Sequence, residues 1–144
     1  MKKFKKILIM GLPGSGKTTL AKELINMIDA EWLNADIVRE KFKDFDFSEE
    51  GRLRQAERMK KLAEKIISDN KHAVVDFICP TPLTRKIFSA DIIIWMDTIK
   101  SGRFEDTNKM FISPDIYDFR VTEKNSKLWV NKIVSELKEK KIII

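Results

Sequence analysis

The chain has 144 residues, of which 43% are hydrophobic, and this is the size and composition of one compact domain with a single buried core. One cysteine excludes a disulfide framework within the chain, and no apolar run approaches the roughly 20 residues that cross a bilayer. The formal net charge of +6 would suit a nucleic-acid partner, but glutamates interleave with the lysines of the central helical pattern, which favours a solvated surface.

The chain opens with the pattern of a buried strand that leads into a helix. Residues 5–10 form a short apolar run that ends in glycine, as a parallel strand does before a turn. Over 16–28, apolar residues recur at helical spacing and give one face that would pack on a sheet. A second strand is predicted over 31–34, followed by a loop that carries Asp36 and Arg39.

A long charged helix is predicted in the middle of the chain. Residues 42–47 are interpreted as an aromatic linker, after which Ser48 precedes two glutamates and a glycine in the manner of a helix N-cap. The helix would end near Ser68 and bury a stripe of apolar side chains. Three polar residues lie off that stripe: Arg52, Gln55 and Arg58.

The second half of the chain supplies a closing helix around 130–137 and three more strands. These strands are predicted over 73–78, 91–97 and 117–122. Residues 101–114 show no periodicity and are predicted to form a mobile loop. Strands that alternate with helices predict an α/β fold, a five-stranded parallel sheet with helices on both faces, and we expect 1–144 to form a single domain.

Segment 11–18 matches the phosphate-loop pattern GxxxxGK[ST] and lies between a predicted strand and a predicted helix. Backbone N–H groups and the positive end of the helix dipole would hold the phosphates of ATP. Lys17 would reach the β- and γ-phosphates, and the Thr18 hydroxyl would bind the Mg²⁺ that bridges them. The residues predicted to bind ATP are Gly11, Pro13, Gly14, Ser15, Gly16, Lys17, Thr18 and Thr19.

Carboxylates follow or end two other predicted strands. Asp36 would lie at the carboxyl edge of the sheet, where it could accept a hydroxyl proton, and Arg39 could hold an anionic group of the acceptor. An ordinary ion pair between these two residues is the alternative. Asp76 would steady the magnesium ion together with Thr18, although an aspartate that caps a strand end is equally compatible with its position.

In these motifs the sequence resembles adenylylsulfate kinase, the P-loop enzyme that phosphorylates the 3′-hydroxyl of adenosine 5′-phosphosulfate. The similarity covers most of the chain. It runs in order through 11–19, 34–39, Phe47-Ser48 followed by Arg52, and 77–80 followed by Arg85. The resemblance implies a P-loop kinase fold and an ATP-dependent phosphotransferase.

The resemblance also implies roles on the acceptor side. Asp36 would be the catalytic base, with Lys17 as the catalytic residue of the phosphate side. Arg39 and Arg52 would contact the phosphosulfate, and Phe47 would stack on the acceptor adenine, although its spacing fits a core position equally well. The acceptor would be bound by Asp36, Arg39, Phe47, Arg52, Gln55, Ile78, Cys79 and Phe104.

The segment after the fourth strand departs from the family. Its members usually carry a longer lid with a Gly-Leu-Tyr-Lys run and a neighbouring arginine, whereas 97–111 is shorter and lacks that run. The candidate replacements for the positive charge are Lys100, Arg103 and Lys109. The candidate second stacking rings are Phe104 and Phe111.

We therefore expect a cytoplasmic kinase that uses ATP and Mg²⁺ and acts on a small nucleotide-like substrate, with adenosine 5′-phosphosulfate, and thus sulfate assimilation, as the leading hypothesis. Another nucleoside derivative, such as one used in surface-polysaccharide modification, is the first alternative. A polynucleotide end kinase and a nucleotide sensor without turnover have less support. We expect no nucleic-acid or membrane partner, and a homodimer is left open.

Overall fold

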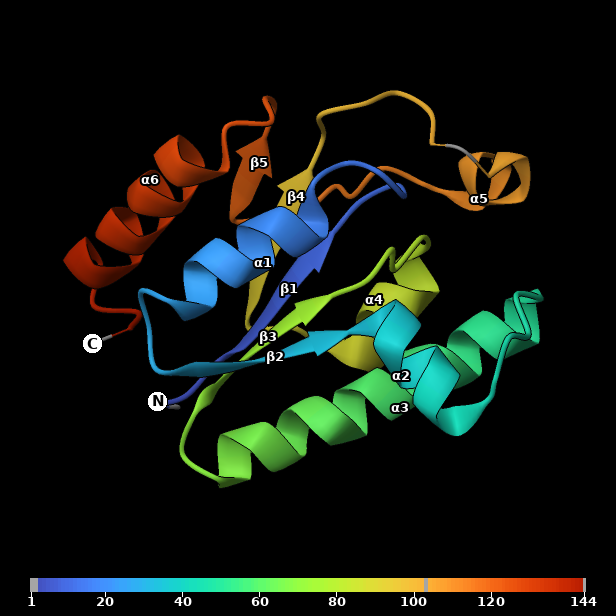
Figure 1. The fold of residues 1–144 in the computed structure, drawn as a ribbon, viewed down its shortest axis with the longest axis horizontal. Helices are drawn as coiled ribbons and strands as arrows, with labels where there is room; N and C mark the ends of the chain where they lie inside the picture. Colours follow the sequence, from blue (N-terminus) through green and yellow to red (C-terminus); the bar gives the residue numbers. More distant parts are fainter. Residues whose placement is uncertain (1–2, 103, 144) are drawn as a thin grey trace.

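The computed structural model describes residues 3–102 and 104–143, and its centre is a five-stranded parallel sheet in the order β2-β3-β1-β4-β5 (Figure 1). The strands are β1 (Lys6–Met10), β2 (Ala30–Asn34), β3 (His72–Asp76), β4 (Ile92–Met96) and β5 (Phe119–Val121). Each overlaps one of the predicted strands. The predicted fold class is therefore confirmed.

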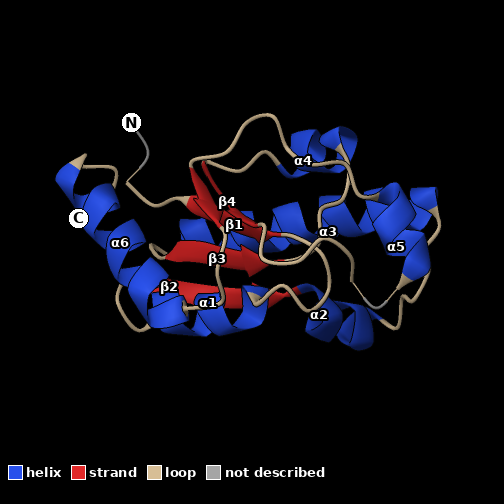
Figure 2. Cartoon of the chain, turned by 90° about the horizontal axis from the view of Figure 1, so that it is seen from above, coloured by secondary structure: helices blue, strands red, loops and turns tan. Residues whose placement is uncertain are grey.

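Helices cover both faces of the sheet, as the view from above in Figure 2 shows. Helices α1 and α6 pack on one face, and α3 and α4 pack on the other. The bounds are α1 (Lys17–Ile25), α2 (Ala35–Phe42), α3 (Glu49–Ser68), α4 (Pro82–Phe88), α5 (Glu105–Met110) and α6 (Ser126–Glu139). Among the described residues, no helix is long and apolar enough to span a membrane.

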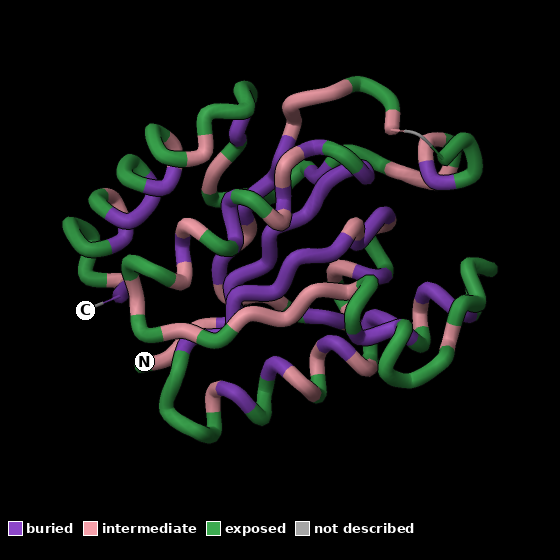
Figure 3. The backbone as a smooth tube through the Cα atoms, in the orientation of Figure 1, coloured by how far each residue is buried: buried purple, intermediate pink, exposed green. Residues whose placement is uncertain are grey.

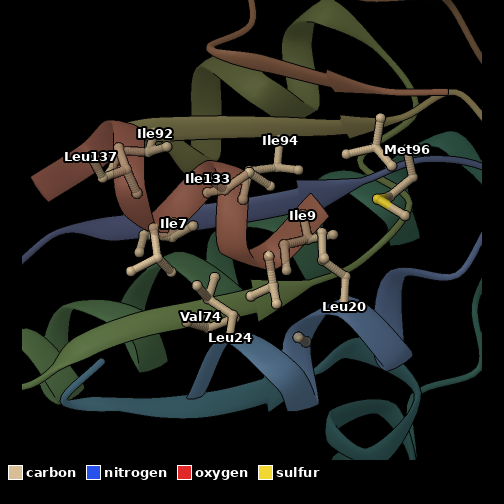
Figure 4. Packing of buried hydrophobic residues seen from close by; sticks show 14 of the residues in the cluster. Ile7, Ile9, Leu20, Leu24, Val74, Ile92, Ile94, Met96, Ile133 and Leu137 are labelled. Atoms are coloured by element: carbon tan, nitrogen blue, oxygen red, sulfur yellow. The ribbon is translucent and has the colours of Figure 1, made fainter. Parts of the chain in front are cut away.

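The central strand β1 shows why the sheet needs cover on both sides. All five of its residues are buried, as are those of β3, so the middle of the tube in Figure 3 is continuously buried. Ile7 and Ile9 pack toward α1 and α6, as Figure 4 shows, while Leu8 and Met10 pack toward α3. Successive strand residues point to opposite faces, and both faces are apolar here.

Three short helices correct the sequence prediction. Helix α2 follows β2 directly, because the Asn34 side chain accepts a hydrogen bond from the Ile37 N–H at 3.0 Å and caps it. Asp36 and Arg39 therefore lie on a helix and not on the predicted loop. Helix α5 lies within the segment predicted to lack regular structure, and α4 begins at Pro82, one of the two prolines predicted to stop the third strand.

The long helix α3 confirms its predicted start and end. The Ser48 hydroxyl accepts a hydrogen bond from the Gly51 N–H at 3.1 Å, which is the expected N-cap. Arg52 and Gln55 lie off the apolar stripe but are buried, at 8% and 3% exposure. Both side chains face a cavity beyond the edge of the sheet.

Candidate active site

A cavity of ≈ 860 Å³ lies at the carboxyl edge of the sheet. It joins the phosphate loop to residues of α2, α3 and the segment around α5, which are far apart in the sequence. The predicted site residues that line it are Pro13, Gly14, Gly16, Lys17, Thr18, Thr19, Asp36, Arg39, Phe47, Arg52, Gln55, Asp76, Ile78, Cys79 and Phe104. Gly11 and Ser15 are buried behind the loop and do not line the cavity.

The phosphate loop is built by backbone conformation and by contacts to β4. Gly16 has φ +99°, a conformation that side-chain-bearing residues rarely adopt, and it begins α1. Lys17, which is 9% exposed, donates from Nζ to the Leu12 carbonyl at 2.9 Å. The Thr98 hydroxyl donates to the Ser15 carbonyl at 2.6 Å and ties the end of β4 to the loop.

Asp76 gathers polar side chains below the phosphate loop. Its Oδ2 accepts hydrogen bonds from Thr18 Oγ1 at 3.1 Å, Trp32 Nε1 at 3.0 Å and Asn34 Nδ2 at 3.1 Å. The hydroxyl and the carboxylate are oxygen ligands of the kind that Mg²⁺ prefers. Within residues 3–102 and 104–143 no three His, Cys, Asp or Glu side chains form a metal site.

The part of the lining that α2, α3 and the loop between them contribute presents an aromatic ring close to two arginines. Phe47 is 51% exposed, so the alternative of a core position is excluded. The Cζ atoms of Arg39 and Arg52 lie 4.4 and 5.7 Å from its ring centroid. Arg39 Nη1 donates hydrogen bonds to the carbonyls of Asp44 and Asp46. These two carbonyls, and not the Asp36 carboxylate of the alternative ion pair, are therefore its hydrogen-bond partners.

Both arginines remain charged despite their burial. Loss of solvent lowers the pKa of Arg39 and of Arg52, but the usual pKa of a guanidinium is so high that neither group loses its proton near neutral pH. Arg52 donates from Nε to the Phe47 carbonyl at 2.9 Å and from Nη2 to the Thr107 hydroxyl at 3.3 Å. Two partly desolvated cations therefore face the cavity and would attract an anion strongly.

Asp36 lies in the first turn of α2, is exposed and lines the cavity. Gln55 holds this turn, because its Nε2 donates to the Ala35 carbonyl at 3.1 Å. Its Oε1 accepts from Arg58 Nη1 at 2.8 Å, so both ends of the amide are engaged within the protein. Gln55 was predicted to bind substrate, and its contacts here support the position of Asp36.

Cys79 lines the cavity with φ +48°, and its side chain is fully buried. Burial raises the pKa of its thiol to about 12, because the thiolate would lose its solvation. The Cys79 carbonyl accepts a hydrogen bond from Arg85 Nε at 3.0 Å. The residue therefore contributes shape and backbone to the site, with a thiol that stays protonated.

We expect the Cys79 thiol to be inert toward a disulfide reagent in the native protein at neutral pH, because the thiolate is the reactive form. Reaction should become complete after denaturation in guanidinium. Spectrophotometric thiol titration measures both states, with Cys79→Ser as the blank. Rapid stoichiometric labelling of the native protein would contradict the burial argument.

The shortened lid is more structured than its sequence predicts. Asn108 of α5 closes a small ring with Gly102: the Gly102 N–H donates to Asn108 Oδ1 at 2.7 Å, and Asn108 Nδ2 donates to the Gly102 carbonyl at 2.9 Å. The Ile112 N–H donates to the Pro80 carbonyl at 2.8 Å, which ties the far end of the segment to the site. Its mobility stays a prediction.

The lid residues proposed from sequence separate into two groups. Phe104 lines the cavity and is 55% exposed, as a stacking ring would need to be. The Phe111 ring centroid lies 5.5 Å from Arg85 Cζ, and Phe111 does not line the cavity. Lys100 and Lys109 are exposed and do not line the cavity either. Arg103 lies outside the described residues.

Closure of the lid should depend on both ligands. We expect an acceptor nucleotide and a nonhydrolysable ATP analogue together to slow amide hydrogen exchange over 104–112 more than either does alone, because a closed lid would contact both. Mass-detected hydrogen exchange measures this. The β1 peptide, already buried, provides the internal control. Equal protection with and without ligands would show a static connector.

Seven cavity residues are missing from the predicted site residues: Asn34, Ala35, Phe77, Pro80, Asp106, Thr107 and Lys124. Lys124 follows β5, so the rule that ligands bind at the carboxyl ends of parallel strands could have identified it. Asn34 ends β2 and could have been found in the same way. Asp106 and Thr107 reach the cavity through α5, which the sequence pattern does not reveal.

The sheet order, the phosphate loop and the adjoining cavity define a P-loop protein with a kinase-like fold. The chain belongs to the AAA domain family, whose model matches residues 7–88 and so extends from β1 through α4. The matched segment contains the phosphate loop, Asp36, Arg52 and Asp76. No curated protein matches the chain.

Solved structures support the same fold. The protein APE1195 has a TM-score of 0.82 at 19% identity, with 96% of this chain and 97% of that chain covered. The APS kinase of Mycobacterium tuberculosis in complex with AMPPNP and APS has a TM-score of 0.73 at 21% identity, covering 96% and 99%. Shikimate kinase from Aquifex aeolicus has a TM-score of 0.68 at 17% identity, covering 95% and 98%. The predicted resemblance to adenylylsulfate kinase is thus supported at the level of the P-loop kinase fold, which other small-molecule kinases share.

Proposed function

We propose that the protein is an ATP-dependent kinase that phosphorylates the 3′-hydroxyl of adenosine 5′-phosphosulfate or of a similar nucleotide that carries an anionic group. One observation carries the proposal. A phosphate loop and a phenylalanine flanked by two arginines line one cavity, together with Asp36. This arrangement can hold a triphosphate on one side and a flat base with an anion on the other.

In the proposed reaction, the acceptor oxygen bonds to the γ-phosphorus while the bond to the β–γ bridging oxygen breaks, and ADP leaves. Asp36 accepts the hydroxyl proton, and Lys17 stabilises the negative charge that moves onto the bridging oxygen. A magnesium ion held near Thr18 and Asp76 would neutralise charge on the β- and γ-phosphates. Arg39 and Arg52 orient the acceptor through its anionic group.

The lining favours a nucleotide over a sugar or a small hydroxy acid. The exposed Phe47 ring supplies a face on which a nucleotide base can stack, and Phe104 offers a second such face. The solved shikimate kinase shares the fold, so the lining of the cavity, and not the fold, supports the choice of acceptor. Another nucleoside derivative would satisfy the same contacts and is the main alternative.

A coupled ADP-release assay with a panel of acceptors tests the proposal. The panel contains adenosine 5′-phosphosulfate, adenosine monophosphate, shikimate, gluconate and an oligonucleotide with a free 5′-hydroxyl. We expect the highest kcat/KM with adenosine 5′-phosphosulfate and identify the product's phosphorylated position by ³¹P NMR. Faster turnover of shikimate or gluconate would overturn the nucleotide proposal, and faster turnover of the oligonucleotide would favour an end kinase.

A further inference from the structure

One aspartate of the loop that carries Phe47 bonds this loop to its surroundings. Asp44 lies between α2 and α3, and its side chain is only 12% exposed. Its carboxylate accepts two hydrogen bonds from Arg54, at 2.9 and 3.2 Å, and one from Arg58 Nη2 at 3.0 Å. It also accepts the Asp46 N–H at 3.1 Å, and Arg39 Nη1 lies 4.0 Å from Asp44 Oδ1.

These partners come from both helices that flank the loop. Arg39 belongs to α2 and also donates to the Asp44 and Asp46 carbonyls, at 3.0 and 3.2 Å. Arg54 and Arg58 belong to α3, and Arg54 extends to Asp46 Oδ2 at 3.0 Å. The Asp44 carboxylate therefore joins the two helices through the loop between them.

The loop lies against α3 at unusually close range. A Cβ atom built on Gly51 would lie 2.2 Å from the Asp46 carbonyl oxygen, so only glycine allows this approach. The Asp46 side chain accepts the Ser48 N–H at 3.0 Å on the same side. Phe47 is thus held between two backbone positions that are each bonded to their surroundings.

Arg58, which donates a hydrogen bond to Asp44, is held in place by a further hydrogen bond. Arg58 donates to Gln55, and Gln55 donates to the Ala35 carbonyl, so the hydrogen-bonded chain continues to the first turn of α2. Hydrogen bonds from Arg54 and Arg58 hold the pKa of the Asp44 carboxyl well below its usual range. The carboxylate therefore stays ionised at any pH used to assay a kinase.

We propose that Asp44 is a positioning residue of the acceptor site, which presents Phe47 and Arg39 to the acceptor by fixing the segment 43–48 on α3. This inference rests on the proposed function, because it assumes that Phe47 and Arg39 face the acceptor. An isolated surface ion pair contributes little to ordering. The Asp44 carboxylate differs from such a pair, because it is largely buried. It accepts two hydrogen bonds from Arg54 and also pairs with Arg58.

The kinetic test compares Asp44→Asn and Asp44→Ala with the wild type. We expect the KM for adenosine 5′-phosphosulfate to rise about tenfold, the effect of losing one charge-assisted hydrogen bond in the alignment of a binding group. The KM for ATP should change little, because the phosphate loop does not contact Asp44. The change in kcat should be smaller than the change in the acceptor KM, because Asp44 reaches the turn of Asp36 only through Arg58 and Gln55. Arg54→Met should have a smaller effect than either, since Arg58 remains bonded to Asp44.

The matched control is Asp118→Asn. Its carboxylate accepts the Ile93 N–H at 2.7 Å and so performs a similar local task, but none of its immediate neighbours in the sequence lines the cavity, whereas the loop of Asp44 carries Phe47. Neither KM should change in this variant. Equal increases in the KM for ATP and for the acceptor in Asp44→Asn would indicate a general structural role and overturn the proposal.

A second measurement needs no acceptor. Amide hydrogen exchange over 43–48 should accelerate in Asp44→Asn, while β1 and β3 keep their protection. If the wild type fails to phosphorylate adenosine 5′-phosphosulfate, the proposed function fails on its own, and exchange still decides the role of Asp44. Acceleration confined to 43–48 supports the positioning role, and unchanged exchange there overturns it.

Discussion

Replacing Lys17 with alanine is expected to lower kcat by about 10³-fold, the scale for losing one preorganised charge at the reacting group. Lys17 is 9% exposed and lines the cavity inside the phosphate loop, so its charge acts in a region that excludes most water. Negative charge shifts toward the β–γ bridging oxygen during transfer, and the ammonium group stabilises that shift. The coupled ADP-release assay measures the loss.

The control for this variant is Lys22→Ala. Lys22 lies one turn further along α1, with its Nζ 5.5 Å from the Trp32 ring centroid and outside the cavity lining. It should retain wild-type kcat. Full activity of Lys17→Ala, with circular dichroism showing a folded protein, would rule out the phosphate-loop mechanism.

Replacing Asp36 with asparagine should lower kcat by about 10²-fold or more and leave ATP affinity nearly unchanged, as expected for the loss of a positioned base. The substitution keeps the size of the side chain and removes its ability to take a proton. Asp36 is exposed in the first turn of α2, so the change in helix-dipole interaction should cost less than about 1 kcal/mol of stability.

Glu40→Gln is the matched control for Asp36→Asn, because Glu40 is an exposed carboxylate on the same helix outside the cavity lining. Its kcat should equal that of the wild type. Steady-state kinetics with varied ATP and varied acceptor separate the possibilities. Weaker ATP binding with intact kcat in Asp36→Asn would instead assign Asp36 to the metal site or to structure.

The strands and the long helices could be predicted because their apolar residues follow simple local patterns. Every residue of β1 and β3 is buried, and short, mostly apolar runs of this kind are typical of parallel strands covered on both faces. Ser48 also marks the start of α3 by a local rule, since its hydroxyl caps the helix. These signals depend on neighbouring residues alone.

The short helices could not be recognised from period. Helix α4 has only 7 residues, yet its start carries a local signal: Thr81 and Thr84 form a capping box with Pro82 in the first turn. The same two prolines, Pro80 and Pro82, are also compatible with the end of a strand, so the pattern alone does not identify the helix. Helix α5 has no side-chain cap, and its position depends on the hydrogen bond that Thr107 accepts from Arg52 of the distant helix α3.

The residues of the site also fall into those that local sequence predicts and those that only the structure reveals. The phosphate loop was recognisable because its spacing is set by the local geometry of one turn and one helix. The bonds of Asp44 to Arg54 and Arg58 required the structure, since charged residues at these spacings usually face solvent. The place of Lys124 in the cavity lining could be predicted only once the structure showed that β5 lies beside β4 in the sheet.

The strand order has a consequence for how the chain acquires its nucleotide site during folding. The phosphate loop follows β1, whose two neighbours are distant in the chain: Lys6 pairs with Ala73, and Ile7 pairs with Ile92. Both pairings require the closure of a long loop, which costs conformational entropy before the strand contacts form. Such topologies therefore fold slowly. A growing chain that has already exposed residues 11–18 therefore lacks the support of β3 and β4 until the later residues have been synthesised. Nucleotide should bind the completed sheet and not the nascent segment, and by mass action it would stabilise only molecules that have finished folding.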